Sequence, residues 1–237
     1  MNQSLFNISL QESKQVLRDF SLFKNNGLKS INNDGVTEEF KLSSQKATYK
    51  ETFLVALRNF DYDIILNDQS FFQFQMKKNG NDLELRYAFF QTPFTFRSYQ
   101  DFVSELLVNE NNKETLEEIG ELFHFEYQQY LDEQELLENY STIRYDFEGK
   151  GYRPLIHSTS HLHIGYQNHM RIPLNKTLTP LKFVLFVIKQ VYYREWKEKA
   201  NSDLDYIKDK LTRARINCTD LKAIQWNSNE QLDLHIL

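Results

Sequence analysis

Four of the six histidines lie in one short stretch, residues 144–173 (RYDFEGKGYRPLIHSTSHLHIGYQNHMRIP), which also holds Arg144, Asp146 and Arg171. Imidazole exchanges protons near neutral pH, and guanidinium binds phosphate through paired hydrogen bonds. Cleavage of a phosphodiester without a metal requires a base, an acid and cations that offset the charge of the transition state. The composition of this stretch therefore points to chemistry on phosphate esters.

Two runs within the stretch, STIRYDF and HLHIGY, are typical of short strands. Side chains alternate between the two faces of a strand. In the second run the aliphatic Leu162 and Ile164 must be buried, which turns His161 and His163 to the opposite face. If the two strands pair with their polar faces aligned, these histidines meet the arginine and aspartate of the first run.

The residue types then suggest roles. His161 and His163 are the candidate acid and base, with His157 as a third candidate, and Asp146 would orient an imidazole or bind a metal. The candidate phosphate-binding residues are Arg144 and Arg171.

Aromatic side chains could add base stacking to these contacts. Tyr152 and Tyr166 are candidates to stack on nucleic-acid bases, whereas Tyr145 is expected in the core.

A metal-assisted site is an alternative. His161 and His163 on one strand face, with Asp146, form a three-ligand set for zinc or manganese that leaves a position for water. The nearby arginines weigh against a bound cation, so the cofactor is either absent or a divalent metal. A structural polar cluster, or an interaction surface without chemistry, is the remaining interpretation.

Other motifs in this stretch do not support a known catalytic signature. HST at 157–159 is half of a two-histidine phosphoesterase signature and has no second copy. HLHIG begins like a histidine-triad motif, but Gly165 stands where the third histidine is required. GKG at 149–151 lacks the later Gly and Lys of a phosphate-binding loop.

Composition indicates a folded protein with an aromatic core, since 41% of the residues are hydrophobic and the chain has 19 Phe and 13 Tyr. The single cysteine, Cys218, excludes an internal disulfide and is typical of a reducing compartment. FVLFVI at 183–188 is too short to cross a bilayer, and the first residues do not resemble a signal peptide. We therefore expect a cytoplasmic protein without a membrane partner.

The pattern of helix and strand signals predicts an α+β fold, with a mostly antiparallel sheet packed against several helices in a single domain over 1–237. Asn79-Gly80 between two β-rich runs predicts a hairpin. Helices are predicted with caps at Ser9, Thr48, Thr179 and Ser202. The alternating tail QLDLHIL is predicted to close a sheet edge, and a short helix is predicted from Ser98.

Charge is distributed unevenly along the chain. Residues 101–138 carry twelve acidic residues and one lysine, whereas residues 139–200 carry ten basic and four acidic residues. A long acidic helix is predicted at 114–138, on which His124 is expected to be structural. This helix could dock a protein partner encoded by a neighbouring gene, while the basic segment binds nucleic acid.

The ordered set of Arg-Tyr-Asp at 144–146, HSTSHLHIG, RIP and the following Pro-led apolar helix resembles an uncharacterised bacterial family, domain of unknown function 2290. The resemblance implies a bacterial protein and, by analogy, a defence or toxin-like gene class in which nucleases are common. The leading hypothesis is a nucleic-acid-directed hydrolase, that is, a nuclease such as a ribonuclease. The alternatives are a non-catalytic interaction or nucleic-acid-binding subunit of a multi-protein system, and a small-molecule phosphoesterase with an enclosed pocket.

Overall fold

The computed structural model describes residues 1–29, 35–80, 82–93, 99, 102–103, 123–133, 140–167, 170–233 and 235. Contacts between residues divide the chain into two compact units, residues 1–91 with 141–237 and residues 92–140. The single domain expected over the whole chain stays a prediction. Among the described residues, no helix is both long enough and apolar enough to cross a membrane.

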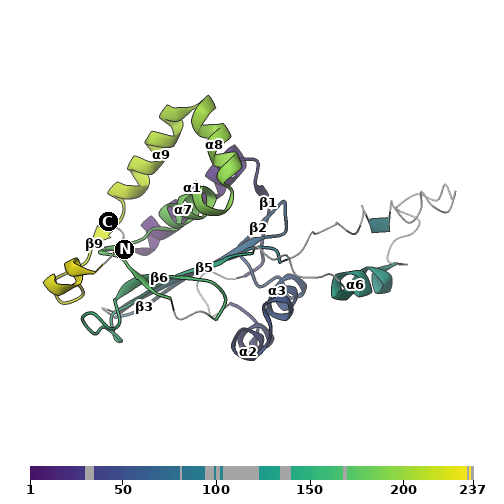
Figure 1. Ribbon diagram of the computed structural model, residues 1–237, viewed down its shortest axis with the longest axis horizontal. Coiled ribbons are helices and arrows are strands. Elements are labelled where there is room, and N and C mark those ends of the chain that lie inside the picture. Colours follow the sequence, from purple (N-terminus) through teal and green to yellow (C-terminus); the bar gives the residue numbers. More distant parts are fainter. Residues whose placement is uncertain are drawn as a thin grey trace. The chain divides into compact units, whose positions relative to one another are not determined.

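A seven-stranded sheet forms the centre of the larger unit (Figure 1). Strands that follow one another in the chain are neighbours in the sheet, and every pair is antiparallel. From edge to edge the strands are β1 (Phe23–Asn26), β2 (Ile64–Leu66), β3 (Phe71–Asn79), β4 (Asp82–Phe90), β5 (Thr142–Glu148), β6 (Ser160–Ile164) and β7 (Ile172–Pro173). The predicted α+β class, with an antiparallel sheet and several helices, is confirmed.

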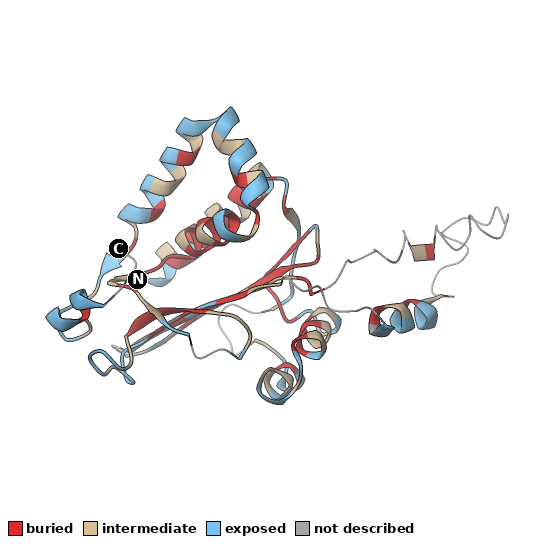
Figure 2. Ribbon diagram, viewed as in Figure 1, coloured by how far each residue is buried: buried red, intermediate tan, exposed pale blue. Residues whose placement is uncertain are grey.

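Helices α1 (Gln3–Asp19) and α7 (Pro180–Val191) pack on one face of this sheet. Phe183 of α7 lies against Phe72 and Tyr87, with ring centroids 6.3 and 5.8 Å apart. Thr179 caps α7 and Pro180 occupies its first turn, as predicted. The main hydrophobic core lies between these helices and the sheet, where buried residues are concentrated (Figure 2).

Helices α2 (Glu38–Lys46) and α3 (Tyr49–Arg58) pack on the opposite face. The rings of Phe40 and Phe90 are 6.0 Å apart, and those of Phe53 and Phe71 are 5.3 Å apart. The predicted capping box at Thr48 is present at the start of α3. Sequence analysis did not predict α2.

The β3–β4 hairpin forms where Asn79-Gly80 predicted it. Asn79 pairs with Asp82, and Gly80 has a φ of +62°, the left-handed conformation that glycine adopts without steric cost. Strand β5 follows β4 in the sheet, so the hairpin directly adjoins the strands of the histidine-rich stretch.

The other described elements of this unit lie in the C-terminal part of the chain. They are β8 (Lys176–Thr177), α8 (Tyr193–Ser202), α9 (Leu204–Ile216), β9 (Thr219–Asp220) and the 3₁₀ helix η1 (Ser228–Leu232).

Two predicted helix caps were wrong. Helix α1 begins at Gln3, six residues before Ser9, with Asn2 as its cap, because its apolar stripe extends back to Phe6. Ser9 is instead buried inside the helix, where its hydroxyl accepts a 2.9 Å hydrogen bond from the backbone N–H of Leu181.

The last predicted helix begins one residue later than expected. Ser202 ends α8, and Asp203 caps α9 by accepting a 3.0 Å hydrogen bond from the N–H of Tyr206. The tail QLDLHIL was also predicted wrongly where it is described, since its residues 231–232 belong to the 3₁₀ helix η1 rather than to a strand. A capping box between Asn227 and Glu230 holds this turn, and buried Glu230 also accepts a 2.7 Å hydrogen bond from the hydroxyl of Tyr152.

The described part of the smaller unit contains α6 (His124–Glu133). His124 stacks on Tyr99 at 4.4 Å, in agreement with its predicted structural role. The helix predicted from Ser98, apart from residues 99 and 102–103, and the parts of the predicted acidic helix before 123 and after 133 lie outside the described residues.

Candidate functional site

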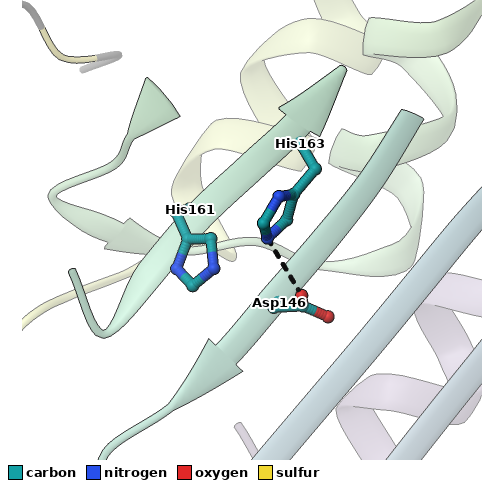
Figure 3. Close-up of side chains that lie close together, drawn as sticks. All are labelled: Asp146, His161 and His163. Atoms are coloured by element: carbon teal, nitrogen blue, oxygen red, sulfur yellow. Dashed lines mark ion pairs between the residues drawn. The ribbon is translucent and has the colours of Figure 1, made fainter. Parts of the chain in front are cut away.

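The pairing of β5 with β6 brings the predicted catalytic residues together (Figure 3). Arg144 lies opposite His163, and Asp146 lies opposite His161. Residues directly opposite each other on antiparallel strands share a face, so these four side chains lie on one face of the sheet. Leu162 is buried on the other face, as the pleat argument predicted.

Asp146 is the centre of this group. Its carboxylate lies 3.3 Å from His163 Nε2, and it accepts hydrogen bonds from Arg144 Nε at 2.8 Å and from Arg86 Nε at 3.2 Å. Burial raises the pKa of Asp146, but the hydrogen bond from His163 and the two arginine charges outweigh burial and hold the pKa well below its ordinary value. Asp146 is therefore an anion at neutral pH.

The protonation of His161 follows from its contacts. Its Nδ1 lies 2.8 Å from the carbonyl oxygen of Ser158. A carbonyl can only accept, so Nδ1 carries the proton and Nε2 bears the lone pair. Burial lowers the pKa of His161 to about 4, and the hydrogen bond to Ser158 opposes this effect only in part. The imidazole is therefore neutral at pH 7, with one nitrogen able to accept a proton or bind a metal.

Three imidazoles form a row that ends at Asp146. The rings of His157 and His161 are 5.1 Å apart, and those of His161 and His163 are 4.8 Å apart. Within the described part of the chain, Nδ1 of His157 and Nδ1 of His163 are buried without a hydrogen-bond partner. Such atoms are rare in folded proteins and are often found where a ligand or solvent completes the site.

The histidines are far less accessible than the arginines. His161 and His163 are 3% and 6% exposed, whereas the side chains of Arg144 and Arg86 are 46% and 63% exposed. The histidines lie on the predicted face of the sheet, but the structure buries them. A ligand approaching this face therefore meets the two guanidinium groups first.

The structure does not bring every predicted residue to this cluster. The hydroxyl of Tyr152 donates to Glu230 at 2.7 Å and accepts from the N–H of Asn227. Exposed Arg171 lines a separate depression beside Glu230.

Tyr166 is held by the helices on this face of the sheet. Its hydroxyl lies 2.8 Å from Thr52 Oγ1, and its ring contacts Tyr49 edge-on at 5.2 Å. The fourth histidine of the stretch, His169, lies outside the described residues.

Arg86 is the site residue that sequence analysis missed. It lies on β4 opposite Asp146, with its neighbours Leu85 and Tyr87 buried on the other face. The alternation in LELRYAFF indicates that Arg86 is directed away from the core. What the sequence does not contain is the pairing of β4 with β5, which brings residues sixty positions apart into contact.

The cluster also has the composition of a metal site. Asp146, His161 and His163 each offer one ligand atom, and the three atoms lie within 4.8 Å of one another. The bond from His161 Nδ1 to a backbone carbonyl is typical of metal-binding histidines. Against this, both carboxylate oxygens of Asp146 already accept from arginines, whose charge opposes a second cation.

A comparison with known families finds a match that spans all of these residues. The family described as "Uncharacterized conserved protein (DUF2290)" matches residues 15–236. The chain belongs to this family. The match includes Arg86, Asp146 and the three described histidines of the row. No curated protein and no solved structure matches the chain.

Proposed function

We propose that the protein hydrolyses phosphodiester bonds of nucleic acid at the Asp146–histidine cluster. The observation that carries the proposal is the contact of one partly buried carboxylate with two arginines and a histidine, beside a second, neutral histidine. This arrangement combines a proton acceptor, an oriented imidazole and cations on one face of the sheet.

Each residue has a role that its geometry supports. His161, with a free lone pair on Nε2, would take the proton from the attacking hydroxyl or water. His163, whose Nε2 is held by Asp146, would supply a proton from its other ring nitrogen, Nδ1, to the leaving oxygen. Arg144 and Arg86 contact Asp146 through Nε, so their terminal amino groups would bind the phosphate oxygens and offset the charge that develops there. Arg86 thus takes the place that sequence analysis gave to Arg171.

Cleavage of end-labelled RNA, single-stranded DNA and double-stranded DNA tests this proposal. We expect His161→Asn and His163→Asn to slow cleavage by about 100-fold or more, because general acid–base catalysis contributes about 10²–10⁴-fold. The same substitution at His124, which is exposed and lies in the smaller unit, is the matched control and should leave the rate unchanged. Circular dichroism shows whether each variant is folded.

The same assay decides whether a metal takes part. With the metal-free mechanism, EDTA leaves the rate unchanged. With zinc or manganese bound by His161, His163 and Asp146, EDTA abolishes cleavage and the metal restores it. The proposal is wrong if no nucleic acid is cleaved with or without added metal, or if folded His161→Asn and His163→Asn variants cleave at the wild-type rate.

Burial of the imidazoles favours one second candidate, a subunit that binds nucleic acid without cleaving it. In that case the exposed guanidinium groups of Arg144 and Arg86 hold phosphate, and the histidines only position Asp146. Arg144→Gln would then weaken binding of labelled RNA by about tenfold. His161→Asn would leave binding unchanged, and no cleavage would be seen.

A further inference from the structure

A pocket opens on the same face of the sheet as the Asp146–histidine cluster, between α2 and strands β3 and β4. It has a volume of about 400 Å³, within the range of pockets that hold small ligands. Its basic lining residues are Lys29, Lys41, Lys77 and Arg86. None of the described residues that line it is acidic. The lining is therefore basic, although Lys29, Lys41 and Arg86 each pair with a carboxylate that lies outside it.

The basic residues of this pocket differ in their contacts. Lys29 is buried and paired with Asp63 at 2.9 Å, so it supports the wall of the pocket rather than a ligand. Lys41 pairs with Glu38, but both side chains are exposed, and such a pair contributes little to stability. A phosphate group could displace Glu38 from Lys41 at small cost. Lys77 and Arg86 reach the pocket from the sheet itself.

The pocket adjoins the Asp146–histidine cluster through one shared residue, Arg86. Gln75 of β3, Arg86 of β4, Asp146 of β5 and His161 of β6 are successive cross-strand partners, so they form one row on one face. Arg86 both lines the pocket and contacts Asp146. Neighbouring strands are about 4.8 Å apart, so Gln75 and Asp146 lie about 10 Å apart, a distance that one nucleotide can bridge.

A parallel row of cross-strand partners also links the pocket to Arg144 and His163. Gln73, Ala88, Arg144 and His163 are also successive cross-strand partners. Ala88, which lines the pocket, places only a methyl group where a longer side chain would fill it.

Polar and apolar groups in the pocket suit a nucleotide base. Gln45 and Gln75 provide amide groups of the kind that hydrogen-bond base edges, and Ser44 adds a hydroxyl. Gln73 also lines the pocket, where its Nε2 donates to the backbone oxygen of Asp61 and leaves its Oε1 to accept. Phe40 adds an apolar surface at the side of α2. A base can enter such a depression only from an unpaired strand, because bases in a duplex are stacked.

We infer that this pocket binds one nucleotide of a single-stranded nucleic acid, next to the phosphodiester held at Asp146. The inference rests on the proposed function for the position of that phosphodiester. Lys41 and Lys77 contact the phosphates that flank the bound nucleotide, and the glutamines contact its base. The substrate class is therefore single-stranded RNA or DNA, rather than a duplex or a free phosphate monoester.

Fluorescence anisotropy with labelled eight-nucleotide single strands of RNA and DNA tests this inference. The measurement uses the His161→Asn protein so that the probe stays intact. Adding Lys41→Gln and Lys77→Gln together should weaken binding at low salt by at least tenfold. The slope of log Kd against log salt concentration should become shallower by about 1.4, since each single-strand phosphate contact contributes about 0.7.

The matched control is Lys189→Gln with Lys197→Gln, which removes the same charge from exposed positions on α7 and α8. This control should bind as the His161→Asn protein does. The inference is overturned if the Lys41/Lys77 variant binds single strands like the control, or if a labelled octamer of glutamate binds in the pocket and nucleic acid does not.

Cleavage by proteins with native His161 separates this inference from the proposed function. If both the pocket and the proposed hydrolysis are correct, Lys41→Gln/Lys77→Gln raises KM for single strands and leaves kcat within about twofold of the wild-type value. If binding falls but the wild-type protein cleaves nothing, the pocket stands and hydrolysis is refuted. If cleavage depends on His161 but both binding and KM are unaffected by the lysines, hydrolysis stands and the pocket is refuted.

Discussion

Acidification is expected to destabilise the fold through His161. Its pKa of about 4 in the folded protein lies below the ordinary value of 6.5, because the ring is buried. Between these two values the unfolded chain binds a proton at this residue and the folded chain does not. The stability that His161 contributes is thus fully present above about pH 6.5 and is lost as the pH falls toward 4.

The size of the effect follows from the two pKa values. A difference of one in pKa corresponds to about 1.4 kcal/mol, so the full loss is about 3 kcal/mol. Between about pH 7 and pH 5 the loss is about 2 kcal/mol. The pKa of Asp146 is also lowered, but its contribution is lost only below its ordinary value of 3.8 and does not enter this interval.

Urea unfolding followed by the fluorescence of Trp196 and Trp226 measures this loss. His161→Asn keeps an amide N–H at the position of Nδ1, which can still donate to Ser158, and removes the titrating ring. We expect the variant to lose about 2 kcal/mol less stability than the wild type between about pH 7 and pH 5. The two proteins are compared by how much stability each loses between the two pH values. Any cost of the smaller side chain that is the same at both pH values therefore cancels.

His124→Asn is the control for loss of a histidine as such, because His124 is exposed on α6. The physical account of the cluster is refuted if His161→Asn and the wild type lose the same stability over this interval. That result would mean that the folded protein admits a proton at His161 as readily as the unfolded chain does.

Two further substitutions test the packing that positions the site. Gly27→Ala should destabilise the fold by about 2–3 kcal/mol in urea unfolding, because the added Cβ would lie only 1.7 Å from the carbonyl oxygen of Tyr62. Tyr145→Phe should cost about 1–3 kcal/mol by the same measurement. The buried hydroxyl of Tyr145 accepts from the N–H of Leu178 at 3.0 Å and lies 3.1 Å from Ser160 Oγ, and both groups would lose this partner.

Each of these two substitutions has a matched control variant. Gly149→Ala adds a methyl group where no atom lies within 4 Å and should change stability by less than about 0.5 kcal/mol. Tyr193→Phe removes a hydroxyl from an exposed tyrosine and should be equally mild. If Gly27→Ala or Tyr145→Phe were as mild as its control, the close approach or the buried hydrogen bonds described here would be wrong.

Several local features followed from the sequence because their causes lie within a few residues. Asn79-Gly80 predicted the β3–β4 hairpin, and Thr179 with Pro180 predicted the start of α7. Alternation within β5 and β6 predicted which side chains share a face. The two wrong cap predictions show the limit of such local sequence signals. Ser9 has the residue type of a cap, but an apolar stripe that extends to Phe6 continues the helix past it.

Long-range pairing decided the rest of the site. Arg86 belongs to it only because β4 lies beside β5, and α2 adds a basic pocket to the same face of the sheet. Tyr152 and Tyr166 have suitable side chains, but tertiary hydrogen bonds to Glu230 and Thr52 hold them elsewhere.

The sequence by itself thus determined the residue types of the site and the face of the strand on which each lies, since a strand's alternation is a local property. Only the tertiary structure decided which strands are neighbours and how deeply the imidazoles are buried. Strand order and burial depend on contacts between residues far apart in the chain, and these contacts set the charge of Asp146 and the neutrality of His161.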